Sequence, residues 1–251
     1  MTTPWISVQD AIRPQYYRLL YLYRLLILRK RRYRNLLRVT YRLRPRSILE
    51  IGVYKGKHAQ FMIETAKIFA APGQIHYYGF DLFELQSRGD LAHEFAKKPP
   101  AMDQVRSRLE RTGANIHLFK GYSRETLPAF MEKHHDTVKA VDMIFIDGGH
   151  SFETIETDWR YASELIAKHG IIILDDFLSN TEEEVAGVGC QDLVSRLDPR
   201  QYSVQMLEPE DRYVNAWGTL RTRMVAVRIK ERESSKRSPA PESSLAAARA
   251  L

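Results

Sequence analysis

The chain has 251 residues, which is enough for one α/β domain with appendages or for two small domains. Hydrophobic residues make up 44% of the chain and charged residues 27%, and this composition excludes a disordered or fibrous protein. The only cysteine, Cys190, excludes a disulfide framework and a cysteine-based zinc cluster.

The formal net charge of +7 comes from one segment near the N-terminus. Between Ala11 and Leu49 there are eleven Arg and one Lys, and no Asp or Glu. Subtracting these 12 from the 38 basic residues leaves 26, against 31 acidic residues, so the rest of the chain is net acidic. We expect residues 1–46 to form a basic helical arm. The apolar run Leu19–Leu28 is too short to span a bilayer and is interrupted by Arg24.

Three roles are open for this arm. It packs on the sheet domain or on a second subunit, it lies on a membrane surface through residues 11–46, or it binds RNA through its interleaved aromatic and Arg side chains. The net acidic remainder of the chain makes nucleic acid the least favoured partner, and homo-oligomerisation stays open. The N-terminus lacks the features of a secretory signal, so we expect a cytoplasmic protein, either soluble or peripheral at the membrane.

Residues 47–230 alternate short apolar runs with amphipathic stretches, a pattern typical of βαβ units. The predicted strands are Ser47–Ile51, Ile75–Phe80, Ile116–Phe119, Asp142–Ile146, Ile171–Leu174, Tyr202–Leu207 and Met224–Ile229. The predicted helices are Lys57–Ala70, Ala101–Arg111, Arg124–His135 and Phe152–Lys168. The last two strands are separated by a loop, so we expect an α/β, Rossmann-like, doubly wound sheet of seven strands, mostly parallel with a C-terminal antiparallel hairpin. The Ser-, Ala- and Pro-rich residues 231–251 are predicted to be a disordered tail.

Ligands of such sheets bind beyond the carboxyl ends of the strands, so the residues that follow each strand are the site candidates. Glu50, Gly52 and Gly56 surround the first turn, where glycine lets the backbone approach a ligand closely. Asp81 follows the second strand and either accepts hydrogen bonds from ribose hydroxyls or caps a helix. Ser123 follows the third strand and either lies near an adenine or caps the next helix.

Acidic residues follow the fourth and fifth strands, which we expect to be neighbours. Asp147, Asp175 and Asp176 would then converge, and carboxylates at close range repel one another unless a cation lies between them. An all-oxygen ligand set favours Mg²⁺, with Mn²⁺ or Ca²⁺ as alternatives. In the competing interpretation one Asp caps a helix, another contacts the ligand and no metal is bound. His150 is either a proton acceptor beside these acids or a structural hydrogen-bonding residue.

Five motifs in order, LEIGVYKG, GFDLFE, FKGYSRETLP, FIDGGHSFE and ILDDF, resemble those of class I S-adenosylmethionine-dependent methyltransferases. Within that class, residues 47–230 most resemble the metal-dependent O-methyltransferases related to macrocin O-methyltransferase and to the mycinamicin-type sugar O-methyltransferases.

The resemblance implies a role for each candidate. Glu50, Gly52 and Gly56 would shape the pocket for the methionine part of S-adenosylmethionine, Asp81 would hold the ribose, and Ser123 would lie near the adenine. Asp147, Asp175 and Asp176 would bind the metal, Asp147 also bordering the cofactor, and His150 would be the general base. The implied reaction is methyl transfer to a hydroxyl, for which a sugar is the expected acceptor. Alternatives are an RNA methyltransferase and a nucleoside-binding scaffold at a membrane.

Other candidates have weaker arguments. We expect the remaining histidines considered, His58, His76, His93, His134 and His135, to be surface or packing residues. The stretch Trp217–Arg223, between the last two strands, would line the acceptor site on the basis of its position alone.

Overall fold

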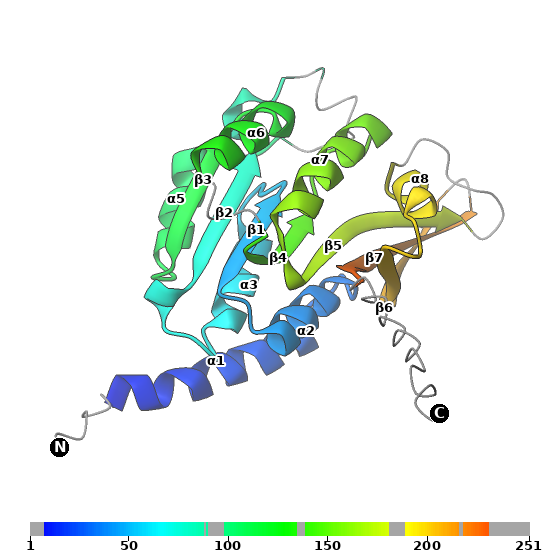
Figure 1. Ribbon diagram of the computed structural model, residues 1–251. Helices are drawn as coiled ribbons and strands as arrows, with labels where there is room; N and C mark the ends of the chain where they lie inside the picture. The colour runs from blue at the N-terminus through cyan, green and yellow to red at the C-terminus, as the bar shows by residue number, and fades with distance from the viewer. Residues whose placement is uncertain are drawn as a thin grey trace, which may run out of the picture.

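The computed structural model describes residues 8–87, 89, 98–134, 139–180, 189–215 and 218–230. Seven strands form one sheet in the order β3-β2-β1-β4-β5-β7-β6 (Figure 1). The first five strands pair in parallel, and β7 pairs antiparallel with both β5 and β6. This confirms the predicted Rossmann-like sheet with its C-terminal antiparallel hairpin.

The strand order reverses between β1 and β4, and this reversal positions the site. Because β1 lies between β2 and β4, the loops after these three strands meet at one edge of the sheet. The strands are β1 (Ser47–Ile51), β2 (His76–Asp81), β3 (Asn115–Lys120), β4 (Val141–Ile146), β5 (Ile166–Asn180), β6 (Tyr202–Asn215) and β7 (Gly218–Ile229).

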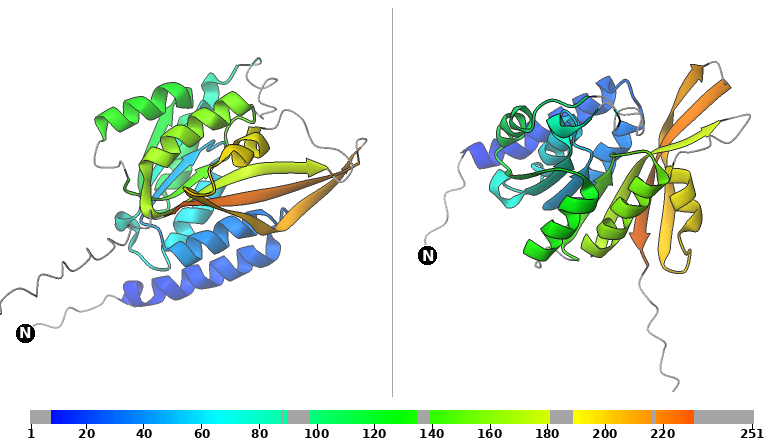
Figure 2. Two further views of the ribbon diagram at one scale, coloured as in Figure 1. Left: turned by 45° about the vertical axis from the view of Figure 1, so that its right-hand side comes forward. Right: turned by 90° about the horizontal axis from the view of Figure 1, so that it is seen from above.

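Helices cover both faces of the sheet (Figures 1 and 2). On one face α2 (Tyr33–Leu43), α3 (Lys57–Ala66) and α5 (Met102–Glu110) share a buried apolar cluster with the strands. On the other face α6 (Ser123–Lys133), α7 (Phe152–Leu165) and α8 (Gly189–Arg196) share a second cluster. Short 3₁₀ turns at Pro72–Gln74 and Phe83–Leu85 flank β2. The central strands are therefore apolar on both faces, as their sequences indicate.

The basic N-terminal segment forms two helices rather than one continuous arm. Helix α1 (Val8–Ile27) is the outermost helix on its side, and α2 lies between it and the sheet (Figure 2). Leu36 and Leu37 of α2 are buried, and Arg24 of α1 is ion-paired with Glu64 of α3. No described helix is both long and apolar enough to cross a membrane. The tail predicted for residues 231–251 lies outside the described residues.

Several predicted boundaries are wrong in the second half of the chain. The helix predicted to reach Lys168 ends at Leu165, and β5 starts at once and runs well past the predicted Leu174. Strands β6 and β7 also extend toward each other and project beyond the helical layers (Figure 2), so Gly218–Arg223 is strand rather than loop. The extensions of β6 and β7 were missed because their sequences, EPEDRYVN and GTLRTR, are mostly polar and lack the apolar run by which strands were recognised. Helix α8 was not predicted at all.

Candidate active site

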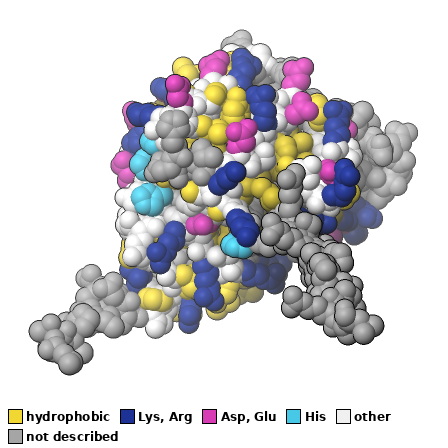
Figure 3. Space-filling view, in the orientation of Figure 1, with side chains coloured by type: hydrophobic (Ala, Val, Ile, Leu, Met, Phe, Trp, Pro, Cys, Tyr) yellow, Lys and Arg dark blue, Asp and Glu magenta, His cyan; other side chains and the backbone are white. Residues whose placement is uncertain are grey.

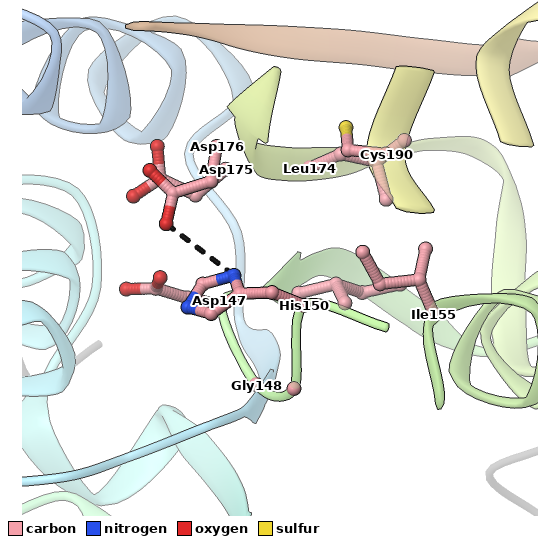
Figure 4. A pocket seen from close by; sticks show the side chains of 10 residues that line it. Asp147, Gly148, His150, Ile155, Leu174, Asp175, Asp176 and Cys190 are labelled. Atoms are coloured by element: carbon pink, nitrogen blue, oxygen red, sulfur yellow. Dashed lines mark ion pairs between the residues drawn. The ribbon is translucent and has the colours of Figure 1, made fainter. Parts of the chain in front are cut away.

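Three carboxylates meet where β4 and β5 end side by side. Asp147 follows the last residue of β4, and Asp175 and Asp176 lie where β5 bulges against β7, between Leu174 and Phe177. The bulge places Asp176 at a φ of +52°, a left-handed conformation that is uncommon for a residue with a side chain. One oxygen from each carboxylate lies within 4.8 Å of the others (Figure 4). The predicted convergence of the three acids is present.

A guanidinium from the N-terminal segment enters this acidic cluster. Arg32, in the link between α1 and α2, donates to both carboxylate oxygens of Asp175 at 2.9 and 3.1 Å. It also donates to Asp176 at 3.1 Å and to Asp211 of β6 at 3.2 Å. Its side chain is only 5% exposed, so these ion pairs are shielded from water. One buried cation therefore bridges β5 and β6 from a segment that the sequence interpretation kept apart from the site.

Burial and mutual repulsion set the charge state of the cluster. Burial raises the pKa of Asp147 well above its usual range, and the carboxylates of Asp175 and Asp176 raise it further. Burial and Asp175 likewise raise the pKa of Asp176. Burial alone would also raise the pKa of Asp175, but the guanidinium of Arg32 outweighs it and holds that pKa below its usual range. Arg32 thus neutralises Asp175 and leaves the other two carboxyls short of positive charge.

Two histidines border the carboxylates. His150, in the loop after β4, has its Nδ1 atom 3.5 Å from Asp176 Oδ2 (Figure 4). His58, near the start of α3, has its Nδ1 atom 3.5 Å from Asp147 Oδ2 and stacks on Tyr33 with ring centroids 4.0 Å apart. Burial lowers the pKa of His58 to about 4, so its imidazole is neutral at pH 7. His58 was expected to be a surface or packing residue, and it packs on Tyr33 but also borders the carboxylate of Asp147.

The loop after β1 packs against the loop after β4. A Cβ atom on Gly52 would lie 2.1 Å from the carbonyl oxygen of Asp147, and Gly52 has a φ of +93°. Only glycine allows this approach. Gly56 ends the same loop as the residue before α3, with a φ of +68°. The two predicted glycines therefore have distinct roles, since Gly52 lets β1 and β4 meet and Gly56 starts a helix.

The remaining predicted residues lie along the same edge of the sheet. Glu50 is fully buried in β1 and accepts a hydrogen bond from the Tyr77 hydroxyl, while its Oε1 atom has no hydrogen-bond partner within the described part of the chain. Asp81 accepts backbone N–H bonds from Tyr54 at 2.7 Å and Phe83 at 2.6 Å. Ser123 is the first residue of α6. The cap of that helix is Tyr122, whose side chain makes no capping bond, so the predicted capping role of Ser123 is wrong.

A cleft of about 1270 Å³ runs over this edge of the sheet. Gly52, Asp81, Ser123, Asp147 and His150 line it together with Asp176, whereas Glu50, Gly56 and Asp175 do not. Its volume exceeds that of a site for one drug-sized ligand, so it has room for two molecules side by side. Residues of α1 and of the α1–α2 link form the wall of the cleft opposite the sheet.

The acidic cluster has the donor set of a divalent cation site. Its three ligand atoms are carboxylate oxygens, which Mg²⁺ and Mn²⁺ prefer, and two of the three carboxyls have raised pKa values. Arg32 brings a single charge to the cluster and shares it with Asp211. The residues therefore fit a divalent ion in addition to Arg32.

Sequence reasoning missed the residues that reach the site from other elements. Arg32 is one of eleven Arg in a basic segment, and nothing in that run distinguishes it. His58 carried a usable signal, because it is the second residue of the helix that follows the Gly52–Gly56 loop and so lies at the same sheet edge as Asp147. Trp217, His93 and His135 lie outside the described residues.

Solved structures of methyltransferases have the same fold as this chain. Many solved structures match the chain, and three of them illustrate the likeness, each covering most of it at low identity. The O-methyltransferase TomG from Streptomyces achromogenes, involved in tomaymycin synthesis and solved with SAM, is 15% identical with a TM-score of 0.54, and the match covers 88% of this chain and 89% of that one. CalS11, a TDP-rhamnose 3′-O-methyltransferase of calicheamicin biosynthesis, is 18% identical with a TM-score of 0.53, and the match covers 87% of this chain and 94% of that one. An rRNA methylase from Streptococcus thermophilus is 13% identical with a TM-score of 0.51, and the match covers 81% of this chain and 99% of that one. At these identities the likeness shows the fold alone.

A match to a protein family goes further than the fold. No curated protein matches the chain. The family described as a methyltransferase domain matches residues 49–177, just over half of the chain, from β1 to the bulge that holds Asp175 and Asp176. This chain belongs to the methyltransferase-domain family.

Proposed function

We propose that this methyltransferase transfers the methyl group of S-adenosylmethionine to a hydroxyl oxygen, with a divalent ion held by Asp147, Asp175 and Asp176. The observation that carries the proposal is the set of three converging carboxylates, two of which, Asp147 and Asp176, line the cleft together with His150. Arg32 supplies one positive charge against three carboxylates, so their remaining repulsion costs stability unless a further cation is bound. Binding a nucleoside alone does not require such a cluster.

The lining of the cleft supports a place for the cofactor along one wall. The loop at Gly52, the carboxylate of Asp81 and the start of α6 at Ser123 lie along one wall. Asp81 already accepts two backbone N–H bonds, but each carboxylate oxygen has a second lone pair for a ribose hydroxyl. Glu50 and Gly56 lie behind this wall, where they support the loop that would surround the methionine part.

The chain's own residues orient the reactants and handle the proton. When bound, the cofactor supplies an electrophilic methyl group, and the ion supplies positive charge that makes a hydroxyl easier to ionise. His150 accepts the hydroxyl proton as the new oxygen–carbon bond forms and the sulfur–carbon bond breaks. Asp176 lies 3.5 Å from His150 Nδ1 and stabilises the protonated ring. Closing the two reactants into one cleft lowers the entropy cost of their encounter.

A sugar hydroxyl is the proposed acceptor. Vicinal hydroxyls can bind one ion through two oxygens, and the cleft lining includes Tyr23, Tyr54 and Tyr122 as well as Arg and Lys side chains. Aromatic rings suit the apolar faces of a sugar ring, and the basic side chains are donors for its hydroxyl oxygens.

Binding measurements test the cofactor site and the metal site separately. Calorimetry should show that the wild type binds both S-adenosylhomocysteine and Mn²⁺. Asp175→Ala should lose Mn²⁺ binding and keep S-adenosylhomocysteine binding, while the exposed Asp103→Asn should keep both. A folded wild type that binds no S-adenosylhomocysteine would contradict the cofactor assignment, and unchanged Mn²⁺ binding by Asp175→Ala would contradict the metal assignment.

Measurements of turnover test the roles proposed for the metal and for His150 as the general base. With a panel of sugar acceptors, excess chelator should abolish S-adenosylhomocysteine formation and Mg²⁺ should restore it. His150→Ala should keep Mn²⁺ binding and lower the rate by roughly 10²–10⁴-fold. Full activity in chelator removes the metal from the mechanism, and a rate within a few-fold of wild type removes His150 as the base.

A further inference from the structure

The outer face of α1 carries a stripe of large apolar side chains that the described residues leave uncovered. Its members are between 53% and 78% exposed, and they are Ile12, Tyr16, Leu19, Leu22, Tyr23, Leu26 and Ile27. Five of them recur at alternating spacings of four and three residues, at positions 12, 16, 19, 23 and 26, so they form one continuous seam along the helix.

The orientation of α1 is fixed by contacts on its other face. Arg24 is ion-paired with Glu64 and lies over the ring of Phe61, with 4.2 Å to the centroid. Tyr21 stacks on Tyr41 of α2, with ring centroids 4.7 Å apart. The helix therefore turns a buried arginine toward the protein and its leucines outward, the reverse of a surface helix that covers a core.

The basic residues beside this stripe limit which partners can cover it. Exposed basic side chains, among them Arg18, Arg29, Lys30 and Arg31, flank it, and no acidic residue occurs between Ala11 and Leu49. Hydrophobic and basic side chains are interspersed along the lower edge of the space-filling view, where α1 lies (Figure 3). Pairing with a second copy of the same face would set cation against cation. RNA would accept the positive charge but has no apolar phase in which to bury Leu19, Leu22 and Leu26.

We propose that α1 docks flat on a bilayer surface rich in anionic phospholipid, with the leucine and isoleucine side chains among the upper acyl chains and the basic side chains on the headgroups. A helix with an apolar face, flanking Arg and Lys, and too little apolar length to span is the type that lies in the membrane interface. Tyr16 and Tyr23 add amphipathic rings suited to the same depth.

Docking would also orient the cleft. Leu20, Tyr23 and Ile27 of the same helix line it, so its mouth would open beside the headgroups. Under the proposed function, an acceptor attached to a lipid could then enter without leaving the membrane surface. The docking itself does not depend on the reaction.

The experiment is flotation of the full chain with vesicles of phosphatidylcholine, with and without phosphatidylglycerol. The wild type should float with the anionic vesicles only, and high salt should weaken the binding. Leu19→Glu/Leu26→Glu should lower vesicle affinity about tenfold or more, because two leucines lose their apolar environment. Neither side chain lines the cleft and both are exposed, so the thermal melt and S-adenosylhomocysteine binding should match the wild type.

The matched control changes two equally accessible apolar residues outside α1, Leu85→Glu/Val214→Glu, and should float like the wild type. The proposal is overturned if the wild type fails to bind anionic vesicles or if Leu19→Glu/Leu26→Glu binds as before. It is also overturned if sedimentation shows a wild-type dimer that these two substitutions dissociate while vesicles stay unbound, or if the protein binds RNA and no vesicles.

Discussion

Glu50 is a carboxyl group enclosed in the centre of the sheet, and its ionisation couples folding to pH. Burial raises its pKa to about 8, against a usual value of 4.5, although the hydrogen bond from Tyr77 acts in the opposite direction. The folded chain therefore keeps a proton that the unfolded chain releases above pH 4.5. The stability that this proton contributes is complete below pH 4.5 and is lost as the pH rises through 8.

Glu50→Gln should remove this dependence. Relative to the variant, wild-type stability in denaturant titrations should fall between about pH 4.5 and pH 8, with a slope of up to about 1.4 kcal/mol per pH unit, and should level off above pH 8. Exposed Glu110→Gln should keep the wild-type profile. Parallel wild-type and Glu50→Gln profiles would mean that Glu50 is ionised in the folded protein.

Replacement of Arg32 should lower the free energy of unfolding. Arg32→Ala leaves Asp175, Asp176 and Asp211 without their shared cation, so we expect a loss of about 3–5 kcal/mol in the free energy of unfolding. The loss should be greater at pH 8 than at pH 5, because carboxyls with raised pKa values destabilise the fold as they ionise.

The neighbouring side chain provides the control. Arg31 is exposed, and Arg31→Ala should change the unfolding free energy by less than about 0.5 kcal/mol. Arg32→Lys should recover part of the loss, since it restores the charge without the two-pronged geometry. Equal stability of Arg32→Ala and Arg31→Ala would show that the bridge contributes nothing.

At the level of the elements, the approach of the β1 loop to the end of β4 fixes where Asp147 lies. Gly52→Ala would place a Cβ atom 2.1 Å from a backbone oxygen of Asp147, so one of the two loops has to move. We expect a destabilisation of about 3 kcal/mol or more and weakened binding of both S-adenosylhomocysteine and Mn²⁺.

Gly73→Ala is the matched control, because a Cβ atom there would meet nothing within 4 Å. It should change stability by no more than about 1 kcal/mol, and binding should not change. Intact Mn²⁺ binding by a folded Gly52→Ala protein would show that Asp147 does not depend on this contact.

The elements also show what could be predicted from sequence. Strands covered on both faces, such as β1 and β4, are short uninterrupted apolar runs, and β1 was predicted at its observed bounds. The acids after β4 and β5 were predicted to converge because parallel neighbours end at the same edge. The bulge at Asp175 and Asp176 could not be predicted, since it depends on the pairing of β5 with β7. Arg32 reaches the site through tertiary packing, which has no local sequence pattern, whereas His58 could have been found from its place at the start of α3.

Across the whole molecule, the N-terminal helices differ in how far the fold depends on them. A chain that starts at residue 30 loses α1 but keeps Arg32 and the buried Leu36 and Leu37. It should unfold cooperatively, bind S-adenosylhomocysteine and fail to bind anionic vesicles. A chain that starts at residue 47 exposes one face of the sheet core and loses the bridge, so it should aggregate and bind no S-adenosylhomocysteine. Normal binding by the shorter chain would make residues 1–46 a separable appendage.

The bridge made by Arg32 also determines when the site can form during synthesis. Its partners Asp175 and Asp211 lie 143 and 179 residues later in the chain. At about 5–20 residues per second, a ribosome needs roughly 10–35 seconds to make the stretch between Arg32 and Asp211. Until Asp211 is made, the nascent segment around Arg32 lacks at least one of these two counter-charges. The site is complete only once β6 has left the ribosome, so it is among the last features of the molecule to form.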